Sequence, residues 1–409
     1  MCVHACFPTG MTLPRYLGSF APPEDLYDVL EAFIAKGPAA FKEFAQTKLM
    51  RAIANGSREG PPLAVELKVV KSRQYLQLPI TIAGTEVEAV AIDSLTTTKE
   101  LLNNCSKKIG LSSSRGFAIR LKAGNAITST GESDVKVLDL LGAAEKKHGE
   151  GVWKLELTKE AFAPWHPSTK EDALALELST QQIFSAVGAG KFKLKDDDAY
   201  VQFAAERYYI EFGEVDSDML GDFLKGKAAA GGEPAIAACF PKKMFASTKK
   251  GAKVSKTAKS VKDWSNLVEK AHAKSKTVRA NTPVADVREG LITRFQTEWP
   301  HFFVTTFAVT KGPGPTIKGF GDGCSLAMNA CGIFVLMGEA KVLQQWGWHV
   351  IDEVKADVNG DFVVKTLADE VARTDASQFS FKPVFKVDVA QFATVGARMK
   401  TADAAPVKL

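Results

Sequence analysis

The spacing of apolar residues predicts that the chain begins with helices. Apolar side chains recur every three or four residues over 24–35 and 41–53, and a shorter stretch of the same kind covers 63–70. Glycine follows each of the first two stretches, and glycine commonly ends helices. We therefore expect a helical region over residues 1–74.

The pattern then changes to short strands around one helix. Residues 76–82 and 87–92 have the composition of strands, and Gly84-Thr85 forms a turn between them. Thr97, followed by Glu100, forms a capping box that starts a helix ending at Gly110. Strands over 117–121 and 135–141 would complete a ubiquitin-like β-grasp.

Helical periodicity returns after a short strand that begins at Trp153. The expected helices follow a second capping box at Ser168 and Glu171, an acidic start at Asp196 to Asp198, and Thr282-Pro283. A further helix is expected over 260–273. This part of the chain is predicted to be a helical bundle.

After Pro300 the chain reads as strands separated by glycine-rich turns. The expected strands lie at 302–309, 325–328, 333–336, 342–351, 362–367 and 379–381. An amphipathic helix over 385–399 follows them. This order predicts a small barrel capped by a C-terminal helix, as in a pleckstrin-homology-like lobe.

Composition is that of a soluble globular protein. Hydrophobic residues make up 45% and charged residues 24%, with a net charge of +5. The six cysteines include no Cys-x-x-Cys pair, so neither a disulfide framework nor a zinc site is indicated. We expect a cytoplasmic protein, because no apolar run reaches transmembrane length and no secretory signal is evident.

The sequence contains no motif of a catalytic, metal or cofactor site. It lacks a P-loop, a nucleophile elbow and a zinc-protease signature, and its histidines are scattered. The glycines between Gly312 and Gly323 are interpreted as a loop between strands. Asp196 to Asp198 are interpreted as the start of a helix and not as a cation site. We therefore predict that the protein is not an enzyme.

A lysine-rich segment is the first candidate binding site. The segment runs from residue 242 to residue 276, and its acidic residues are Asp263 and Glu269 alone. Aromatic residues do not alternate with its lysines. Such a segment suits acidic phospholipid, actin or microtubules, whereas nucleic acid is not expected. A solubilising loop is the alternative. The candidate residues are Lys242, Lys243, Lys249, Lys250, Lys253, Lys256 and Lys259.

Several motifs resemble those of a FERM domain. Phe162-Ala163-Pro164-Trp165-His166 is similar to the second lobe of that domain in unconventional myosin tails. The run from Asp93 to Leu101 resembles the start of the first-lobe helix. Arg294-Phe295 with Trp299-Pro300 resembles the beginning of the third lobe.

The N-terminal helices resemble the end of a myosin tail homology 4 (MyTH4) domain. The matching residues are Asn55 to Arg58, Pro61-Pro62, Glu66-Leu67 and Lys71-Ser72. That domain precedes FERM in class VII, X and XV myosins and in a plant and algal kinesin. The usual earlier helices of the domain have no counterpart here, so we expect a truncated version.

The resemblance implies an α+β, multi-lobed chain. It implies C-terminal MyTH4 helices over 1–74 and a ubiquitin-like lobe over 75–145. An acyl-CoA-binding-protein-like helical lobe with a lysine-rich insertion follows over 150–299. A PH-like lobe covers 300–400, and 401–409 form a flexible tail. The three lobes would pack as a FERM cloverleaf.

The resemblance also implies a function. A MyTH4-FERM tail of a cytoskeletal motor binds protein cargo or adaptor tails and links the cytoskeleton to a membrane or to other proteins. The alternatives are a motor-less peripheral membrane adaptor that binds acidic lipid, and the tail of a MyTH4-FERM kinesin. By the same likeness, a peptide groove in the third lobe would be lined by Val389, Phe392 and Val395.

Overall fold

The computed structural model divides the chain into two compact units. One contains residues 1–164, 304–338 and 342–409, here called the first unit, and the second unit contains 165–303 and 339–341. The structure describes Leu13, Leu17 and the ranges 20–72, 74–82, 85–86, 89–131, 133–162, 172–213, 235–245, 258–279, 282–368 and 376–385.

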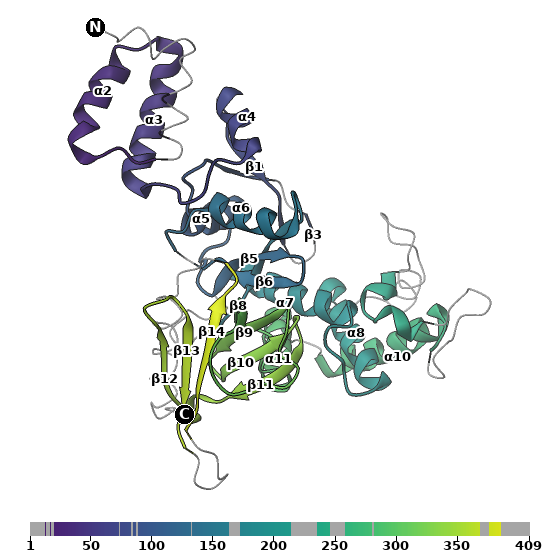
Figure 1. The fold of residues 1–409 in the computed structure, drawn as a ribbon. Helices are drawn as coiled ribbons and strands as arrows, with labels where there is room; N and C mark the ends of the chain where they lie inside the picture. Colours follow the sequence, from purple (N-terminus) through teal and green to yellow (C-terminus); the bar gives the residue numbers. More distant parts are fainter. Residues whose placement is uncertain are drawn as a thin grey trace. The chain divides into compact units, whose positions relative to one another are not determined.

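The expected N-terminal helices are present. A 3₁₀ turn (Glu24–Leu26) leads into α2 (Tyr27–Ala35), which is followed by α3 (Ala39–Asn55) and α4 (Ala64–Ser72) (Figure 1). Gly56 ends α3 with a φ of 71°, in the left-handed region that favours glycine. A small apolar cluster of Leu17, Ile34, Ala45 and Leu49 joins α2 to α3.

A five-stranded sheet follows in the first unit. Its order is β3 (Thr85–Glu86), β2 (Ile80–Ile82), β7 (Trp153–Lys159), β5 (Phe117–Ala123) and β6 (Ala126–Ser129). Strand β7 lies at the centre, parallel to β2 and antiparallel to β5. The sheet therefore uses a strand that the sequence pattern placed at the start of the helical bundle.

The apolar run 76–82 forms two strands and not one. β1 (Leu76–Leu78) pairs with β4 (Val90–Ile92) in a separate two-stranded ladder, while β2 joins the larger sheet. Pro79 lies between them, and proline lacks the N–H that a continuous ladder requires. The expected strand 87–92 is likewise reduced to β4 among the described residues.

Helix α5 (Thr98–Ile109) is built as its sequence predicts. Thr97 accepts a hydrogen bond from the Glu100 amide, and the Glu100 side chain accepts one from the Thr97 amide, which confirms the capping box. Gly110 ends the helix with a left-handed φ of 79°.

The expected strand over 135–141 is wrong, because this segment starts helix α6 (Val137–His148). Its buried residues are Val137, Leu138, Leu140, Leu141 and Ala144. These positions follow helical spacing over 137–144, whereas the run 135–141 alone is too short for periodicity to distinguish a strand from a helix. With β7 at the centre of the sheet, no strand from this segment is required.

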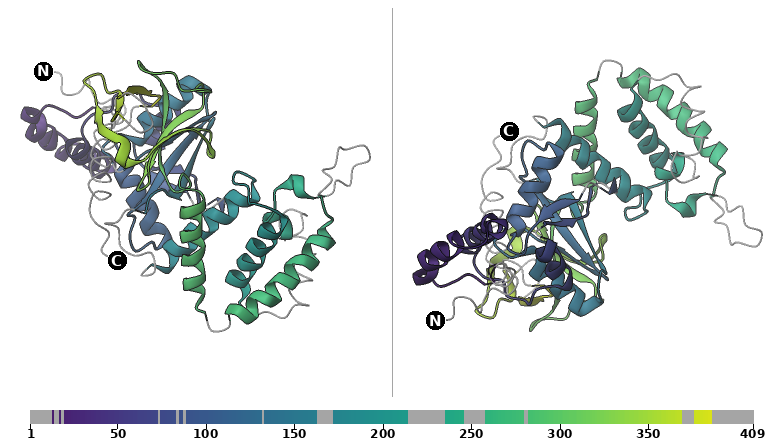
Figure 2. Two further views of the ribbon diagram at one scale, coloured as in Figure 1. Left: turned by 90° about the horizontal axis from the view of Figure 1, so that it is seen from below. Right: turned by 90° about the horizontal axis from the view of Figure 1, so that it is seen from above.

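The second unit is mainly helical in its described part, as expected. Its long helices are α7 (Ala173–Gly188), α8 (Asp197–Phe212), α10 (Val261–Arg279) and α11 (Val284–Glu298). Figure 2 shows them in teal and green as one bundle. Asp196 caps α8 by accepting a hydrogen bond from the Ala199 amide, in agreement with the predicted acidic start. Large aromatic side chains, among them Phe184, Phe203, Trp264 and Phe295, fill the core.

Seven strands form the second large sheet. In chain order they are β8 (Thr305–Lys311), β9 (Cys324–Asn329), β10 (Gly332–Met337), β11 (Lys341–Trp346), β12 (Ile351–Ala356), β13 (Phe362–Thr366) and β14 (Gln378–Pro383). Their order in the sheet is β11-β10-β9-β8-β14-β13-β12. Val304, Ala327, Phe334 and Leu336 pack together as one core cluster.

The expected closed barrel is not formed by these strands. Among the described residues, β11 and β12 are the two edges of an open sheet. The apolar run 342–351, expected as one strand, is interrupted by Gly347 and the 3₁₀ turn Trp348–Val350. This turn redirects the chain, so consecutive strands end at opposite edges. Nearly all of the expected C-terminal helix 385–399 lies outside the described residues.

Candidate functional site

A partly buried ionic cluster joins helix α3 to helix α5 and to Asp93, which follows β4. Arg51 on α3 donates from Nη2 to Asp93 Oδ1 at 3.1 Å and to Glu100 Oε2 at 2.9 Å. Lys48, one turn earlier, reaches Asp93 Oδ2 at 3.3 Å, and Asn55 donates to Glu100 Oε2 at 3.0 Å. The Glu100 carboxylate that caps α5 therefore also holds α3.

This cluster lowers the pKa of both acidic groups. Burial alone would raise the pKa of Asp93, but hydrogen bonds from Arg51 and the charges of Lys48 and Arg51 outweigh it. The pKa of Asp93 falls to about 2. The pKa of Glu100 is also lowered, because its hydrogen bonds from Arg51, the Thr97 amide and Asn55 exceed the cost of burial.

A second ionic cluster fixes the segment after α3 to helix α6. Arg58 pairs with Glu66 of α4 and donates from Nε to Asp139 Oδ1 of α6 at 2.9 Å. The amides of Glu59 and Gly60 donate to the same Asp139 carboxylate at 3.0 and 3.1 Å. Burial raises the pKa of Glu66, although the charge of Arg58 opposes this shift.

Gly60 leaves room for this close approach. A Cβ on residue 60 would lie 3.2 Å from Asp139 Oδ1. The Arg58–Gly60 segment therefore surrounds one carboxylate with a guanidinium and two backbone amides, which is a strong hydrogen-bonding arrangement for an anion.

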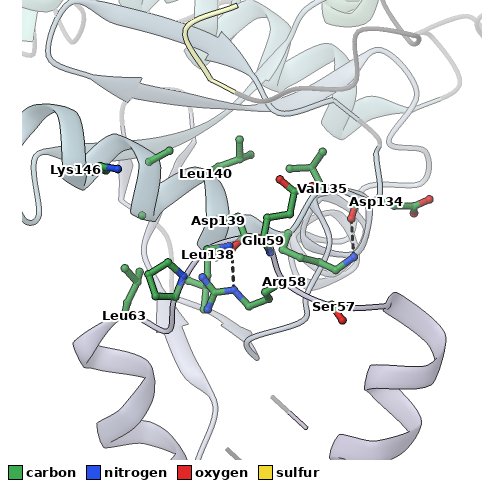
Figure 3. Close-up of a pocket in the computed structure, with 15 residues that line it drawn as sticks. Ser57, Arg58, Glu59, Leu63, Asp134, Val135, Leu138, Asp139, Leu140 and Lys146 are labelled. Atoms are coloured by element: carbon green, nitrogen blue, oxygen red, sulfur yellow. Dashed lines mark hydrogen bonds and ion pairs between the residues drawn. The ribbon is translucent and has the colours of Figure 1, made fainter. Parts of the chain in front are cut away.

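A pocket opens beside this second cluster. It has a volume of about 610 Å³ and lies between residues 57–63 and the segment from Asp134 to Lys146. In Figure 3, Arg58 and Leu63 form one wall, and Leu140 and Lys146 of α6 belong to the opposite wall. Apolar side chains and a few charged groups share its surface, which is typical of binding pockets.

A buried ion pair ties the first sheet to the chain before β8. Arg120 Nε donates to Glu160 Oε1 at 2.8 Å, and Arg120 Nη2 donates to the Val304 carbonyl at 2.6 Å. Burial raises the pKa of Glu160, while the Arg120 charge opposes the shift. Strand β6 also packs against β8. The two large sheets of the first unit are thus joined by a buried polar contact and by the packing of β6 against β8.

The predicted lysine site falls only partly within the described residues. Lys242 and Lys243 lie exposed on a 3₁₀ turn (Lys242–Met244), whereas Lys249, Lys250, Lys253 and Lys256 lie outside the described ranges. Lys259 forms an ion pair with Asp197 and lies 4.3 Å from the centroid of the Trp264 ring. Lys259 therefore contributes to packing in the second unit.

Helix α10 has further exposed lysines. Its exposed residues include Lys262, Lys270 and Lys274, while Trp264 and Val268 on the other side are buried. These lysines belong to the lysine-rich segment 242–276, but they are not among the candidate residues predicted from the sequence.

The other expected site cannot be placed. Val389, Phe392 and Val395, the predicted peptide groove, lie outside the described residues, as does the Trp165-His166 motif. Within the described ranges, no three His, Cys, Asp or Glu side chains gather as metal ligands do. In the same ranges, no helix combines the length and the apolar character needed to span a membrane.

Sequence comparison relates the chain to class VII myosins. The RA-like domain family matches residues 74–161, which contain the five-stranded sheet. Drosophila melanogaster myosin-VIIa is 26% identical over 378 residues, covering 90% of this chain and 16% of the relative. Mus musculus unconventional myosin-VIIb is 27% identical over 308 residues, covering 74% of this chain and 14% of the relative. The chain therefore spans a small part of these relatives.

Solved structures share the fold. The human myosin 7b C-terminal MyTH4-FERM domain, solved with the harmonin-a PDZ3 domain, matches with a TM-score of 0.58 and 15% identity. That match covers 97% of this chain and 74% of the other. A MyTH4-FERM domain of Dictyostelium discoideum myosin VII matches with a TM-score of 0.61 and 14% identity, covering 95% and 74%. The chain is homologous to myosin VII tails and has the α+β fold of their MyTH4-FERM domains.

Proposed function

We propose that this chain is a non-catalytic module that binds protein cargo or adaptors in the tail of a myosin VII-like motor. Its homology to myosin VII tails is the observation that carries the proposal. The human myosin 7b domain of the same fold was solved in complex with a PDZ domain, which supports a protein as the partner here. The module would act in the cytoplasm, at the cytoskeleton.

The ionic clusters support this function physically. Arg51 connects α3 to Asp93 and to α5, and Arg58 connects the segment after α3 to α6. These ion pairs are buried or half-buried, and buried pairs are costly to break. A surface held in one arrangement loses little conformational entropy when a partner binds. The clusters would therefore present the N-terminal helices and the first sheet as one rigid binding surface.

Affinity capture from native cell extract tests the proposal. The chain is compared with a size-matched unrelated protein and with a double variant, Arg51→Ala with Arg58→Ala. We expect the chain to retain specific proteins, each of which then binds as a purified component with saturable, one-to-one stoichiometry. The double variant should retain less. Retention no greater than that of the unrelated protein would contradict the function.

Acidic phospholipid is the second candidate partner. The exposed lysines Lys242, Lys243, Lys262, Lys270 and Lys274 favour it, since each lysine near an anionic membrane contributes about 1 kcal/mol. In this reading the chain is a peripheral adaptor between membrane and cytoskeleton. A triple variant, K262Q with K270Q and K274Q, should then sediment less with anionic vesicles at low salt.

The matched control keeps the same loss of charge elsewhere. K36Q with K42Q and K68Q removes three exposed lysines from the N-terminal helices. A lipid site on α10 would be excluded if both triple variants sedimented equally with anionic vesicles. It would also be excluded if the unmodified chain sedimented equally with anionic and with neutral vesicles. Cosedimentation with actin filaments and with microtubules separates the filament alternatives, including a kinesin-like tail.

A further inference from the structure

Lys136 occupies a position where lysine is unfavourable. It is the N-cap residue of α6, with φ −75° and ψ 131°, and its side chain makes no capping hydrogen bond. Serine, threonine, aspartate and asparagine are favoured there because their oxygens accept from the free amides of the first turn. A cation at this end also opposes the positive pole of the helix dipole.

Burial adds to this cost. Lys136 is only 7% exposed, and its Nζ donates to the Asp134 carbonyl at 2.9 Å. Within the described part of the chain, no carboxylate forms an ion pair with it. With one neutral carbonyl as its acceptor, the ammonium has no counter-ion, and its two other N–H donors are not satisfied by that contact, which is costly in a protein interior.

The neighbouring charges of the pocket are arranged differently. Arg58 is paired with Glu66 and Asp139, and Asp139 in turn accepts from the Glu59 and Gly60 amides. These groups satisfy one another without a ligand. Among the described charges that line this pocket, Lys136 is therefore the buried one that lacks a counter-ion.

The pocket lined by Lys136 offers space for such an anion and for an apolar group beside it. Its volume is about 610 Å³, and Leu63, Val135, Leu138 and Leu140 contribute apolar side chains to its lining. Figure 3 shows Leu63 and Leu140 on different sides of the opening and Val135 near Asp134. The pocket therefore suits a ligand that combines a carboxylate with an apolar side chain.

We propose that this pocket binds a segment of a partner protein in which an aspartate or glutamate lies beside a large apolar residue. The carboxylate pairs with Lys136 Nζ, and the apolar side chain packs against the leucines of the lining. An anionic membrane suits the site less well, because the exposed Glu59 and Asp134 at the pocket would repel a continuous negative surface. The proposal rests on the function proposed above and assigns that function a site.

Selection from a displayed library of short random peptides on the full-length chain tests the proposal. Enriched peptides are synthesised with a fluorophore, and their affinities are measured by anisotropy. Lys136→Gln removes the charge, and Ala143→Phe narrows the pocket from an exposed position on α6. Lys147→Gln is the control, since Lys147 is exposed on the same helix but does not line the pocket.

The expected peptides carry an acidic residue next to a large apolar one. Their affinity should fall about tenfold or more in Lys136→Gln, as for loss of one charge-assisted hydrogen bond, and should fall comparably in Ala143→Phe. Affinity for Lys147→Gln should stay within about twofold of the unmodified chain. Ala143→Phe keeps the test decisive if the glutamine variant does not fold.

Two outcomes would overturn the pocket assignment. One is enrichment of peptides that bind Lys136→Gln and Ala143→Phe as tightly as the unmodified chain. The other is the absence of any acidic and apolar peptide among those enriched. In both cases the capture of native proteins by the unmodified chain would still support the general partner-binding function, so the two proposals fail separately.

Discussion

At the scale of single residues, paired charges and one unmatched charge have different roles. Asp93, Glu66 and Glu160 are buried acidic groups that each face an arginine, so their charges are compensated within the fold. Lys136 is a buried cation without such a partner in the described chain. Compensated pairs are expected to govern stability, and the uncompensated charge is expected to govern recognition.

Asp93 should make stability depend on acid pH. Its pKa is 3.8 in the unfolded reference and about 2 in the fold. Because folding lowers the pKa, the contribution is complete above about pH 4 and is lost as pH falls toward about 2. The change amounts to about 2 kcal/mol in the free energy of unfolding. Urea titrations across this range measure it.

Asp93→Asn should flatten that pH dependence and destabilise the chain at neutral pH by about 3 kcal/mol, because Lys48 and Arg51 lose their anionic partner. Asp134→Asn, at an exposed position, is the matched control and should leave both values close to those of the unmodified chain. Identical acid profiles for the two variants would exclude Asp93 as the titrating group.

At the scale of secondary-structure elements, helix α6 combines two conflicting requirements. Its first turn contains Asp139, which suits the positive pole of the helix and receives three hydrogen bonds from the Arg58–Gly60 segment. Its N-cap is Lys136, which does not suit that pole. A favourable contact to the preceding helices and an unfavourable cap thus lie within one turn.

Lys136→Ser should therefore stabilise the protein. Serine supplies the missing capping acceptor and removes a buried charge, for an expected gain of about 1 kcal/mol in the free energy of unfolding. Thermal and urea denaturation measure this gain. Lys147→Ser, away from the helix start, should not show it. A loss of stability in Lys136→Ser would mean that the lysine is already compensated within the fold.

Asp139→Asn should loosen the segment between α3 and α4 without unfolding α6. The amides of Glu59 and Gly60 donate to the Asp139 carboxylate, and a neutral amide is a weaker acceptor. We expect faster hydrogen exchange at these two amides, measured by NMR. Unchanged exchange there would show that water or other groups protect them.

At the scale of the first unit, one buried polar contact connects distant parts of the chain. Arg120 in β5 contacts Glu160, directly after β7, and also the Val304 carbonyl before β8, which is 184 residues away in the sequence. The β6 and β8 strands pack against each other beside this contact. The two sheets should consequently unfold together.

Arg120→Met tests this cooperativity. The substitution leaves Glu160 buried without its cation, which should cost about 3 kcal/mol or more. Differential scanning calorimetry is combined with hydrogen exchange of the backbone amides in β5 and β9. In the variant, we expect the amides of the two sheets to lose protection at different temperatures. Lys122→Met, which breaks a more exposed pair with Glu156, is the control. Coincident loss of protection in both variants would contradict the coupling.

Local sequence patterns predict most of the helices and indicate much of the family likeness. The signals for these helices are local, because they depend on neighbouring residues alone. They include helical periodicity, the Thr97–Glu100 capping box, the acidic start at Asp196 and the glycine after α5. Motifs around Asp93 and Asn55 likewise indicate the MyTH4-FERM fold without knowledge of tertiary contacts.

Tertiary structure decided which elements meet. Several features depend on pairings between distant segments. They are the division of 76–82 between two sheets, the central place of β7, the helical form of α6 and the open second sheet. The same holds for Arg51 with Asp93, for Arg58 with Asp139, and for the isolation of Lys136. Charge compensation is a property of the folded environment, because a sequence names the ions but not the distances between them.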